Sequence, residues 1–154
     1  MKVYLASPFF NNEQCEVKAK VKKHLTECGY EVIDPQEVEE EEREKDRNIP
    51  NSTWGLKTFY KDILKIKSCD YIVAIDWGLY GDCGTAWEIG YGYAEGLDIL
   101  VLVPDQTVTI PHSLMVANGS NNFITVGEFL KHFDLEIMAT SFSAVEFNKT
   151  IEQK

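Results

Sequence analysis

Apolar residues in this chain form short continuous runs, and between the runs they recur at helical spacing. Continuous runs of β-branched and aromatic residues are typical of buried strands. In the segment 13–28, Val17, Val21, Leu25 and Cys28 lie on one helical face, and Gly29 follows where a helix would end. The pattern therefore predicts an alternation of strands and helices.

The predicted strands are short and evenly distributed, at 3–6, 30–34, 71–75, 98–103 and 123–125. The predicted helices lie at 13–28, 53–67, 84–95, 111–115 and 126–133, and the tail at 134–154 has a mixed helical pattern. Strands that alternate with helices form a parallel sheet covered on both faces. We therefore expect an α/β, flavodoxin-like doubly wound sheet of five parallel strands in the order 2-1-3-4-5.

Length and composition favour a single domain over 1–154, since 154 residues with 44% hydrophobic content suffice for one core. No apolar run approaches the ~20 residues that a membrane helix needs. The N-terminal apolar segment is too short for a signal peptide, so we expect a cytosolic protein. The four cysteines show no CxxC spacing. They are interpreted as reduced thiols, with no metal or cofactor expected.

Charge excludes one class of partner. The formal net charge of −10 argues against binding the anionic backbone of nucleic acids. Half of this charge falls in 37–46, which holds seven acidic and two basic residues. We interpret the connection at 37–52 as a solvated acidic loop, of a length that is typical of lids or disordered segments.

Carboxylates follow the third predicted strand and begin the next helix. In the expected strand order the switch point lies between strands one and three, which brings 4–10 next to 76–88. The predicted cluster contains four carboxylates and five aromatic residues: Asp62, Asp76, Asp82 and Glu88, with Tyr4, Phe9, Phe10, Trp54 and Trp77. The three histidines (His24, His112 and His132) are scattered along the sequence and are interpreted as surface residues.

Paired carboxylates beside aromatic rings suit reactions with an oxocarbenium-like transition state. The dinucleotide, P-loop and serine-hydrolase signatures are absent from the sequence. A purely structural interpretation stays open at this point. Asp76 and Asp82 would then only cap a helix, and Glu88 would be an ordinary exposed helix residue.

Three segments resemble the nucleoside 2-deoxyribosyltransferase family: YLASPFF at 4–10, YKD at 60–62 and GDCGTAWEIGY at 81–91. The resemblance covers about 1–125, and the D-x-G-[TV]-x-x-E-[IL]-G segment is its most specific part. Members of this family exchange the base of a 2′-deoxyribonucleoside through a covalent sugar–glutamate intermediate, without a cofactor. The resemblance implies a small-molecule enzyme that works on a deoxyribonucleoside and a free nucleobase, with retention of configuration.

The resemblance also implies roles for individual residues. It puts the nucleophile on Glu88, its orienting hydrogen bond on Tyr4 and proton handling at the base on Asp62. It puts sugar-hydroxyl binding on Asp82. Asn122 matches a position that reaches into a neighbouring subunit, which implies a homo-oligomer with a site shared between subunits.

Two further matches concern the base: Phe10 matches an aromatic residue beside it, and Gln36 matches a base-contacting glutamine. Some members place a C-terminal carboxylate in the site, but here residues 148–154 follow Phe147 and that role is not carried over. Three aromatic residues of the central helix, Trp87, Tyr91 and Tyr93, cannot all face one small core, which also favours an oligomer.

A second enzyme class is an alternative: a 2′-deoxynucleoside 5′-monophosphate N-glycosidase of the same superfamily. Such hydrolases carry a serine where this chain has Asp82, and an anionic side chain there would repel a phosphate. Ser113 matches another of their phosphate-binding serines, so both readings stay open. A non-enzymatic sensor of small molecules is a third reading. The range of bases and the number of subunits are not determined by the sequence.

Overall fold

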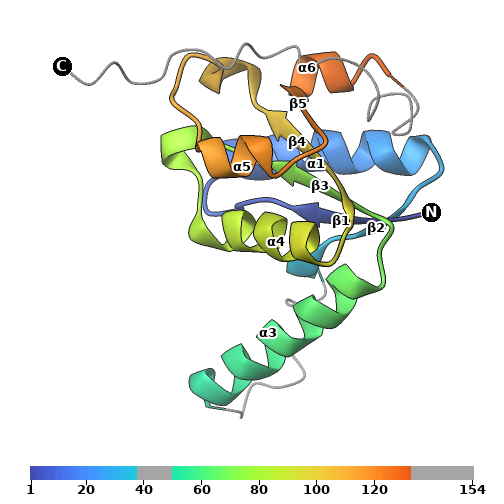
Figure 1. The fold of residues 1–154 in the computed structure, drawn as a ribbon, viewed down its shortest axis with the longest axis vertical. Coiled ribbons are helices and arrows are strands. Elements are labelled where there is room, and N and C mark those ends of the chain that lie inside the picture. Colours follow the sequence, from blue (N-terminus) through green and yellow to red (C-terminus); the bar gives the residue numbers. More distant parts are fainter. Residues whose placement is uncertain (38–49, 133–154) are drawn as a thin grey trace.

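Five parallel strands form one sheet in the computed structural model, which describes residues 1–37 and 50–132 (Figure 1). The strands are β1 (Lys2–Ala6), β2 (Glu31–Ile33), β3 (Tyr71–Ile75), β4 (Asp98–Val103) and β5 (Asn122–Thr125). Their order is β2-β1-β3-β4-β5, and each neighbouring pair is parallel. This confirms the predicted strand order.

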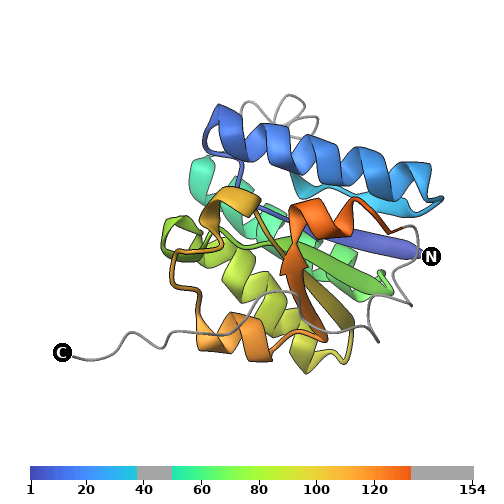
Figure 2. The same cartoon turned by 90° about the horizontal axis from the view of Figure 1, so that it is seen from above.

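Helices cover both faces of the sheet, as predicted. They are α1 (Asn12–Glu27), α3 (Asn51–Lys67), α4 (Cys83–Ala94), α5 (Leu114–Asn118) and α6 (Val126–Phe129), with short 3-10 turns η1 (Gly78–Tyr80) and η2 (Asp105–Thr107). Helices α1 and α6 lie over one face, and α4 and α5 lie over the other (Figures 1 and 2). Strands β1, β3, β4 and β5 are therefore largely buried on two sides, which explains why they are nearly continuous apolar runs, whereas the edge strand β2 is partly exposed.

The alternation of side chains along β1 shows how two cores arise from one strand. Val3 and Leu5 belong to the core beneath α1 and α6, whereas Tyr4 and Ala6 belong to the core beneath α4 and α5. Successive side chains of a strand point to opposite faces, so a strand in the middle of this sheet contributes side chains to both cores. Tyr4 is thereby directed toward α4, although its sequence neighbours are directed away from it.

Helix α4 approaches the sheet closely at Gly92. A Cβ atom at this position would lie 2.2 Å from Cδ1 of the buried Ile72 on β3, far inside van der Waals contact. The absence of a side chain at Gly92 is therefore what allows the helix to reach its observed distance from the strand. In contrast, Gly90 on the same helix is exposed, and a Cβ there would meet nothing within 4 Å.

Several element boundaries differ from the expected ones. β2 is shorter than the predicted 30–34, and a helical turn follows directly at 35–37. The predicted helix at 111–115 begins at Leu114. The last predicted helix, 126–133, ends at Phe129, because the N–H groups of Lys131 and His132 bond carbonyls three residues back and tighten the chain into a turn. Most of the acidic loop (38–49) and the tail (133–154) lie outside the described residues.

Helix α3 differs most from a buried helix. The apolar residues of α3 recur at helical spacing and form a stripe along one face, but within α3 only Ile66 is buried. Four large apolar side chains of α3 are exposed: Leu56, Phe59, Tyr60 and Leu64. Figure 1 shows why, since the amino-terminal half of α3 extends beyond the edge of the sheet. Much of the apolar stripe is therefore available for contact with something other than this core.

None of the helices in the described residues combines the length and the apolar character that a bilayer-spanning segment requires. The cytosolic location and the single domain over 1–154 stay predictions.

Candidate active site

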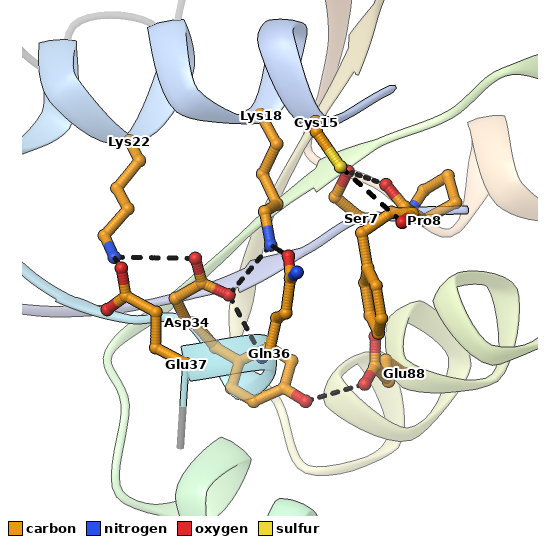
Figure 3. A network of polar contacts seen from close by, with 11 residues as sticks. Ser7, Pro8, Cys15, Lys18, Lys22, Asp34, Gln36, Glu37 and Glu88 are labelled. Atoms are coloured by element: carbon orange, nitrogen blue, oxygen red, sulfur yellow. Dashed lines mark hydrogen bonds and ion pairs between the residues drawn. The ribbon is translucent and has the colours of Figure 1, made fainter. Parts of the chain in front are cut away.

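A hydrogen bond between β1 and α4 joins two of the predicted site residues. The hydroxyl of Tyr4 donates to Oε1 of Glu88 at 2.6 Å, across 84 positions of sequence (Figure 3). Tyr4 is fully buried in the core, whereas Glu88 is half-buried on the helix. Because the buried ring is fixed by packing, this bond holds the Glu88 carboxylate in one orientation at the surface of the core.

The start of α4 depends on Asp82. Its side chain caps the helix, with Oδ1 accepting from the backbone N–H of Thr85 at 3.0 Å and Oδ2 accepting from the Thr85 hydroxyl at 2.6 Å. Gly84 makes room for this cap, since a Cβ there would lie 2.7 Å from Asp82 Oδ1. The interpretation of Asp82 as a helix cap is therefore correct, and its carboxylate places one negative charge at the start of α4.

Asp76 follows β3 and makes a close contact with a histidine that the sequence did not suggest. Its Oδ2 lies 2.6 Å from Nδ1 of His112, and its Oδ1 accepts the N–H of Gly78. Nε2 of His112 lies 3.2 Å from the Thr107 carbonyl oxygen. Burial lowers the pKa of His112, but the hydrogen bond and charge of Asp76, together with the Thr107 carbonyl, outweigh burial and raise it overall. The pair joins the loop after β3 to the loop before α5.

This placement corrects the interpretation of two of the three histidines as surface residues, whereas the side chain of His132 is 42% exposed, as predicted. The side chain of His112 is only 8% exposed. His24 is also buried, with its Nε2 2.6 Å from the carbonyl oxygen of His132. Neither contact follows from sequence spacing, because the partners lie on different elements.

A network of charged and polar groups follows β2 (Figure 3). The carboxylate of Asp34 accepts from Lys18 at 3.1 Å and from Lys22 at 3.5 Å, both on α1. Lys18 also donates to Oε1 of Gln36, whose backbone N–H donates to Asp34 Oδ1 at 3.1 Å. Gln36 is thus held by its main chain and its side chain at once. Gln36 was predicted as a site residue, whereas nothing in the sequence indicated its partners Lys18 and Asp34.

The proposed proton-handling residue, Asp62, lies on α3 in an ion pair with Lys65, whose Nζ is 2.7 Å from Oδ1. Near it, exposed aromatic rings connect α3 with α4. The ring centroids of Phe59 and Trp87 are 5.2 Å apart, and those of Trp87 and Tyr91 are 5.2 Å apart and stacked. The four predicted carboxylates therefore each have a separate partner: Tyr4 for Glu88, Thr85 for Asp82, His112 for Asp76 and Lys65 for Asp62.

Three other predicted residues lie in different environments. Phe10 is 72% exposed beside the amino terminus of α1, and its ring lies 5.5 Å from that of Phe9. Ser113 is exposed just before α5, where its side chain makes no capping bond. Asn122 is buried at the start of β5, with Oδ1 accepting the N–H of Phe123 at 2.8 Å. The role of Asn122 in a neighbouring subunit's site stays a prediction.

Within residues 1–37 and 50–132, no three His, Cys, Asp or Glu side chains gather in a group that could hold a metal ion. The candidate site thus contains Glu88, which accepts a hydrogen bond from Tyr4, Asp82, which caps α4, and Gln36, which accepts a hydrogen bond from Lys18.

This fold and site define a doubly wound α/β protein with a buried tyrosine bonded to a helix glutamate at the switch point. The model of the family "Nucleoside 2-deoxyribosyltransferase" matches residues 3–144. The chain therefore belongs to the nucleoside 2-deoxyribosyltransferase family.

Individual relatives agree with this assignment at low identity. The chain is 28% identical over 86 residues to a nucleoside deoxyribosyltransferase of Lactobacillus leichmannii, and that match covers 56% of this chain and 54% of the relative. A match of the same length to the Lactobacillus johnsonii protein of that name shows 27% identity and covers 57% of the relative. The matched stretch thus spans only about half the length of these curated relatives.

Solved structures cover more of the chain. The structure of a 2-deoxyribosyltransferase from Bacillus psychrosaccharolyticus has a TM-score of 0.74 and 27% identity, covering 90% of this chain and 96% of that one. A CMP N-glycosidase from Clostridium botulinum has a TM-score of 0.59 and 23% identity, covering 88% and 99%. The second likeness shows the shared fold alone.

Proposed function

We propose that this protein is a nucleoside 2-deoxyribosyltransferase that exchanges the base of a 2′-deoxyribonucleoside through a covalent sugar–Glu88 intermediate. The observation that carries the proposal is the 2.6 Å hydrogen bond from the buried Tyr4 hydroxyl to the half-buried Glu88 carboxylate. A hydroxyl fixed in this way leaves the second carboxylate oxygen as the nucleophile, and it limits the orientations that Glu88 can adopt.

The proposed reaction has two displacements. An oxygen of Glu88 forms a bond to C1′ as the glycosidic C–N bond breaks, and the bond's electron pair leaves with the base, which takes up a proton. A nitrogen of the second base then attacks C1′ and releases the Glu88 carboxylate. Each displacement inverts C1′, so two of them restore the original configuration.

The other residues have supporting roles in this proposal. Asp62 transfers the proton to and from the base, Asp82 accepts a hydrogen bond from the 5′-hydroxyl, Phe10 lies against the base and Gln36 bonds its edge. Support for Asp82 comes from its fixed position, since two bonds to Thr85 hold the carboxylate at the start of α4. Asn122, at the start of β5, is proposed to complete the site of a neighbouring subunit, as the family resemblance implies.

The direct test mixes deoxyinosine with free adenine and follows the appearance of deoxyadenosine by chromatography. Glu88→Gln removes the nucleophilic charge while keeping the side-chain volume, so exchange is expected to fall by several orders of magnitude. A 2-fluoro-2-deoxy nucleoside is expected to leave its sugar on the unmutated protein, detected as a mass increase of the intact chain that maps to Glu88. A Glu88→Gln variant with more than about a tenth of the unmutated turnover would contradict the assignment.

The alternative is hydrolysis of 2′-deoxynucleoside 5′-monophosphates, for which the exposed Ser113 is a candidate phosphate contact. Asp82 separates the two functions, because a 5′-phosphate beside this carboxylate would bring like charges together. At ~4 Å and an effective dielectric constant of ~20, each such charge pair costs a few kcal/mol. We therefore expect the enzyme to prefer deoxyadenosine over deoxyadenosine monophosphate by about a hundredfold or more in kcat/KM.

Asp82→Ser tests this explanation, because serine also caps helices but carries no charge. The preference for the nucleoside over the nucleotide is expected to narrow in this variant. Equal use of both substrates by the unmutated protein, with free base and deoxyribose phosphate as products, would support the hydrolase instead.

We also propose that the chain forms a homo-oligomer through α3 and α4. Support comes from the exposed apolar side chains of these helices: Leu56, Phe59, Tyr60, Leu64, Trp87 and Tyr93. Exposed apolar side chains in this number, three of which are in ring contact (Phe59 with Tyr60 and Trp87), are typical of an interface. Light scattering is expected to give a mass above that of one 17.6 kDa chain. A fully active monomer would contradict the proposal.

A further inference from the structure

Lys18 is a buried cation to which the proposed reaction assigns no task. It lies on α1, and its side chain is 8% exposed. Its Nζ lies 3.1 Å from Asp34 Oδ1 and 5.1 Å from the ring centroid of Phe9. Burying a charged lysine is costly unless its partners compensate, so this position calls for an explanation beyond packing.

The third partner of Lys18 is Gln36. The ammonium group donates to Oε1 of Gln36, and the backbone N–H of Gln36 donates to Asp34 at 3.1 Å. An ammonium group has three donors and no acceptor, so the amide of Gln36 can only present its oxygen to Lys18. In Figure 3 the amide nitrogen accordingly lies on the side away from Asp34. Because Lys18 can only donate, the NH₂ group of the Gln36 amide is turned away from the ammonium group.

We propose that Lys18 is a positioning residue that fixes the Gln36 amide with its NH₂ group toward the nucleobase, and so makes the site selective for 6-oxopurines over 6-aminopurines. The proposal rests on the proposed function, in which Gln36 bonds the edge of the base. A 6-oxo group accepts a hydrogen bond from the NH₂ group. A 6-amino group is a donor, so two donors would meet unless the amide rotated.

Rotation of the amide is what Lys18 prevents. A rotated Gln36 would turn its NH₂ group toward the ammonium group and lose a hydrogen bond to a charged partner. The loss of such a bond corresponds to a tenfold to hundredfold change in an equilibrium, to order of magnitude. We therefore expect hypoxanthine to be preferred over adenine by about that factor.

A competition experiment measures this preference. The enzyme receives one donor, 2′-deoxyguanosine, with equimolar hypoxanthine and adenine, and the initial ratio of deoxyinosine to deoxyadenosine is measured. Both acceptors compete for the same sugar–enzyme intermediate, so the ratio reports on the base alone. A general loss of activity or stability changes both products equally and leaves the ratio unchanged.

Two lysine variants provide the comparison. Lys18→Met keeps an unbranched side chain, one atom shorter, and removes the donor, so the ratio is expected to fall toward one. Lys22→Met is the matched control, because Lys22 contacts the same Asp34 carboxylate at 3.5 Å from the same helix. It is expected to keep the unmutated ratio. Circular dichroism melts verify that both variants fold.

A third variant tests the inference if Lys18→Met does not fold. Gln36→Glu keeps an oxygen for Lys18 but has no NH₂ group, so its preference is expected to shift toward adenine. The inference is overturned by an unmutated enzyme that uses both bases equally or prefers adenine, by an unchanged ratio in Lys18→Met, or by an unchanged ratio in Gln36→Glu. If the unmutated protein forms neither product, the proposed function fails, and the inference fails with it.

Discussion

Removal of the Tyr4 hydroxyl tests the contact on which the proposed function rests. In Tyr4→Phe the ring remains in the core beneath α4, and the hydrogen bond to Glu88 Oε1 is lost. Tyr4 is fully buried, so the phenylalanine ring has no freedom to move elsewhere. The variant therefore removes this hydrogen bond with little change in packing.

The expected magnitude follows from the type of bond. A hydrogen bond to a charged group contributes about 1.5–3 kcal/mol, and 1.36 kcal/mol corresponds to a factor of ten in rate. If the bond orients Glu88 for attack, kcat/KM for base exchange is expected to fall about tenfold to a hundredfold. The assay is the conversion of deoxyinosine and adenine into deoxyadenosine, followed at several substrate concentrations.

The matched control is Tyr71→Phe. Tyr71 lies on β3 directly beside Val3 of β1, and its side chain belongs to the opposite core, beneath α1 and α6. The same hydroxyl deletion there is expected to leave kcat/KM unchanged. Turnover by Tyr4→Phe within about twofold of the unmutated enzyme, with Tyr71→Phe equal to it, would refute the role of the bond in orienting Glu88.

Two further predictions concern stability. Gly92→Ala is expected to destabilise the fold by about 1–3 kcal/mol in urea unfolding, because the added methyl group would overlap the buried Ile72 side chain on β3. The control Gly90→Ala, with open space around its Cβ, is expected to stabilise by up to about 1 kcal/mol, and equal effects of the two changes would contradict this reasoning. Asp76 raises the pKa of His112 in the folded protein above its ordinary value of 6.5. The contribution of this pair to the free energy of unfolding is therefore complete below pH 6.5, and it is lost as the pH rises through the folded-state pKa. The free energy of unfolding, measured from pH 5.5 to 8.5, is expected to fall in this way in the unmutated chain and not in Asp76→Asn. Parallel pH profiles for the two proteins would contradict the prediction.

The repeating pattern of the sequence was sufficient to predict the architecture. Apolar runs at 3–6 and 71–75 are strands, and helical spacing correctly predicted α1 and most of α4. The strand order 2-1-3-4-5 also proved correct. These properties are local or follow from general rules of parallel sheets, since burial on both faces demands continuous apolar strands and crossover helices.

Local chemistry likewise predicted part of the site. Asp82 caps the helix that carries Glu88, and the spacing between them within one helix could be read directly from the sequence. The contact of Glu88 with Tyr4 was anticipated only through resemblance to a family. It depends on β1 and α4 lying on the same side of the sheet, with Tyr4 facing that side.

Tertiary structure alone decided the remaining features. The partners Lys18 and Gln36, like Asp76 and His112, come from different elements, and no periodicity indicates which side chains meet across a loop. Burial of Asn122 follows from its place at the start of the edge strand β5, where it pairs with Leu100 of β4. The apolar stripe of α3 is a property of the sequence, but its exposure depends on where the helix lies relative to the sheet edge. Sequence periodicity tells which face of an element is apolar, whereas only the packed arrangement determines what that face contacts.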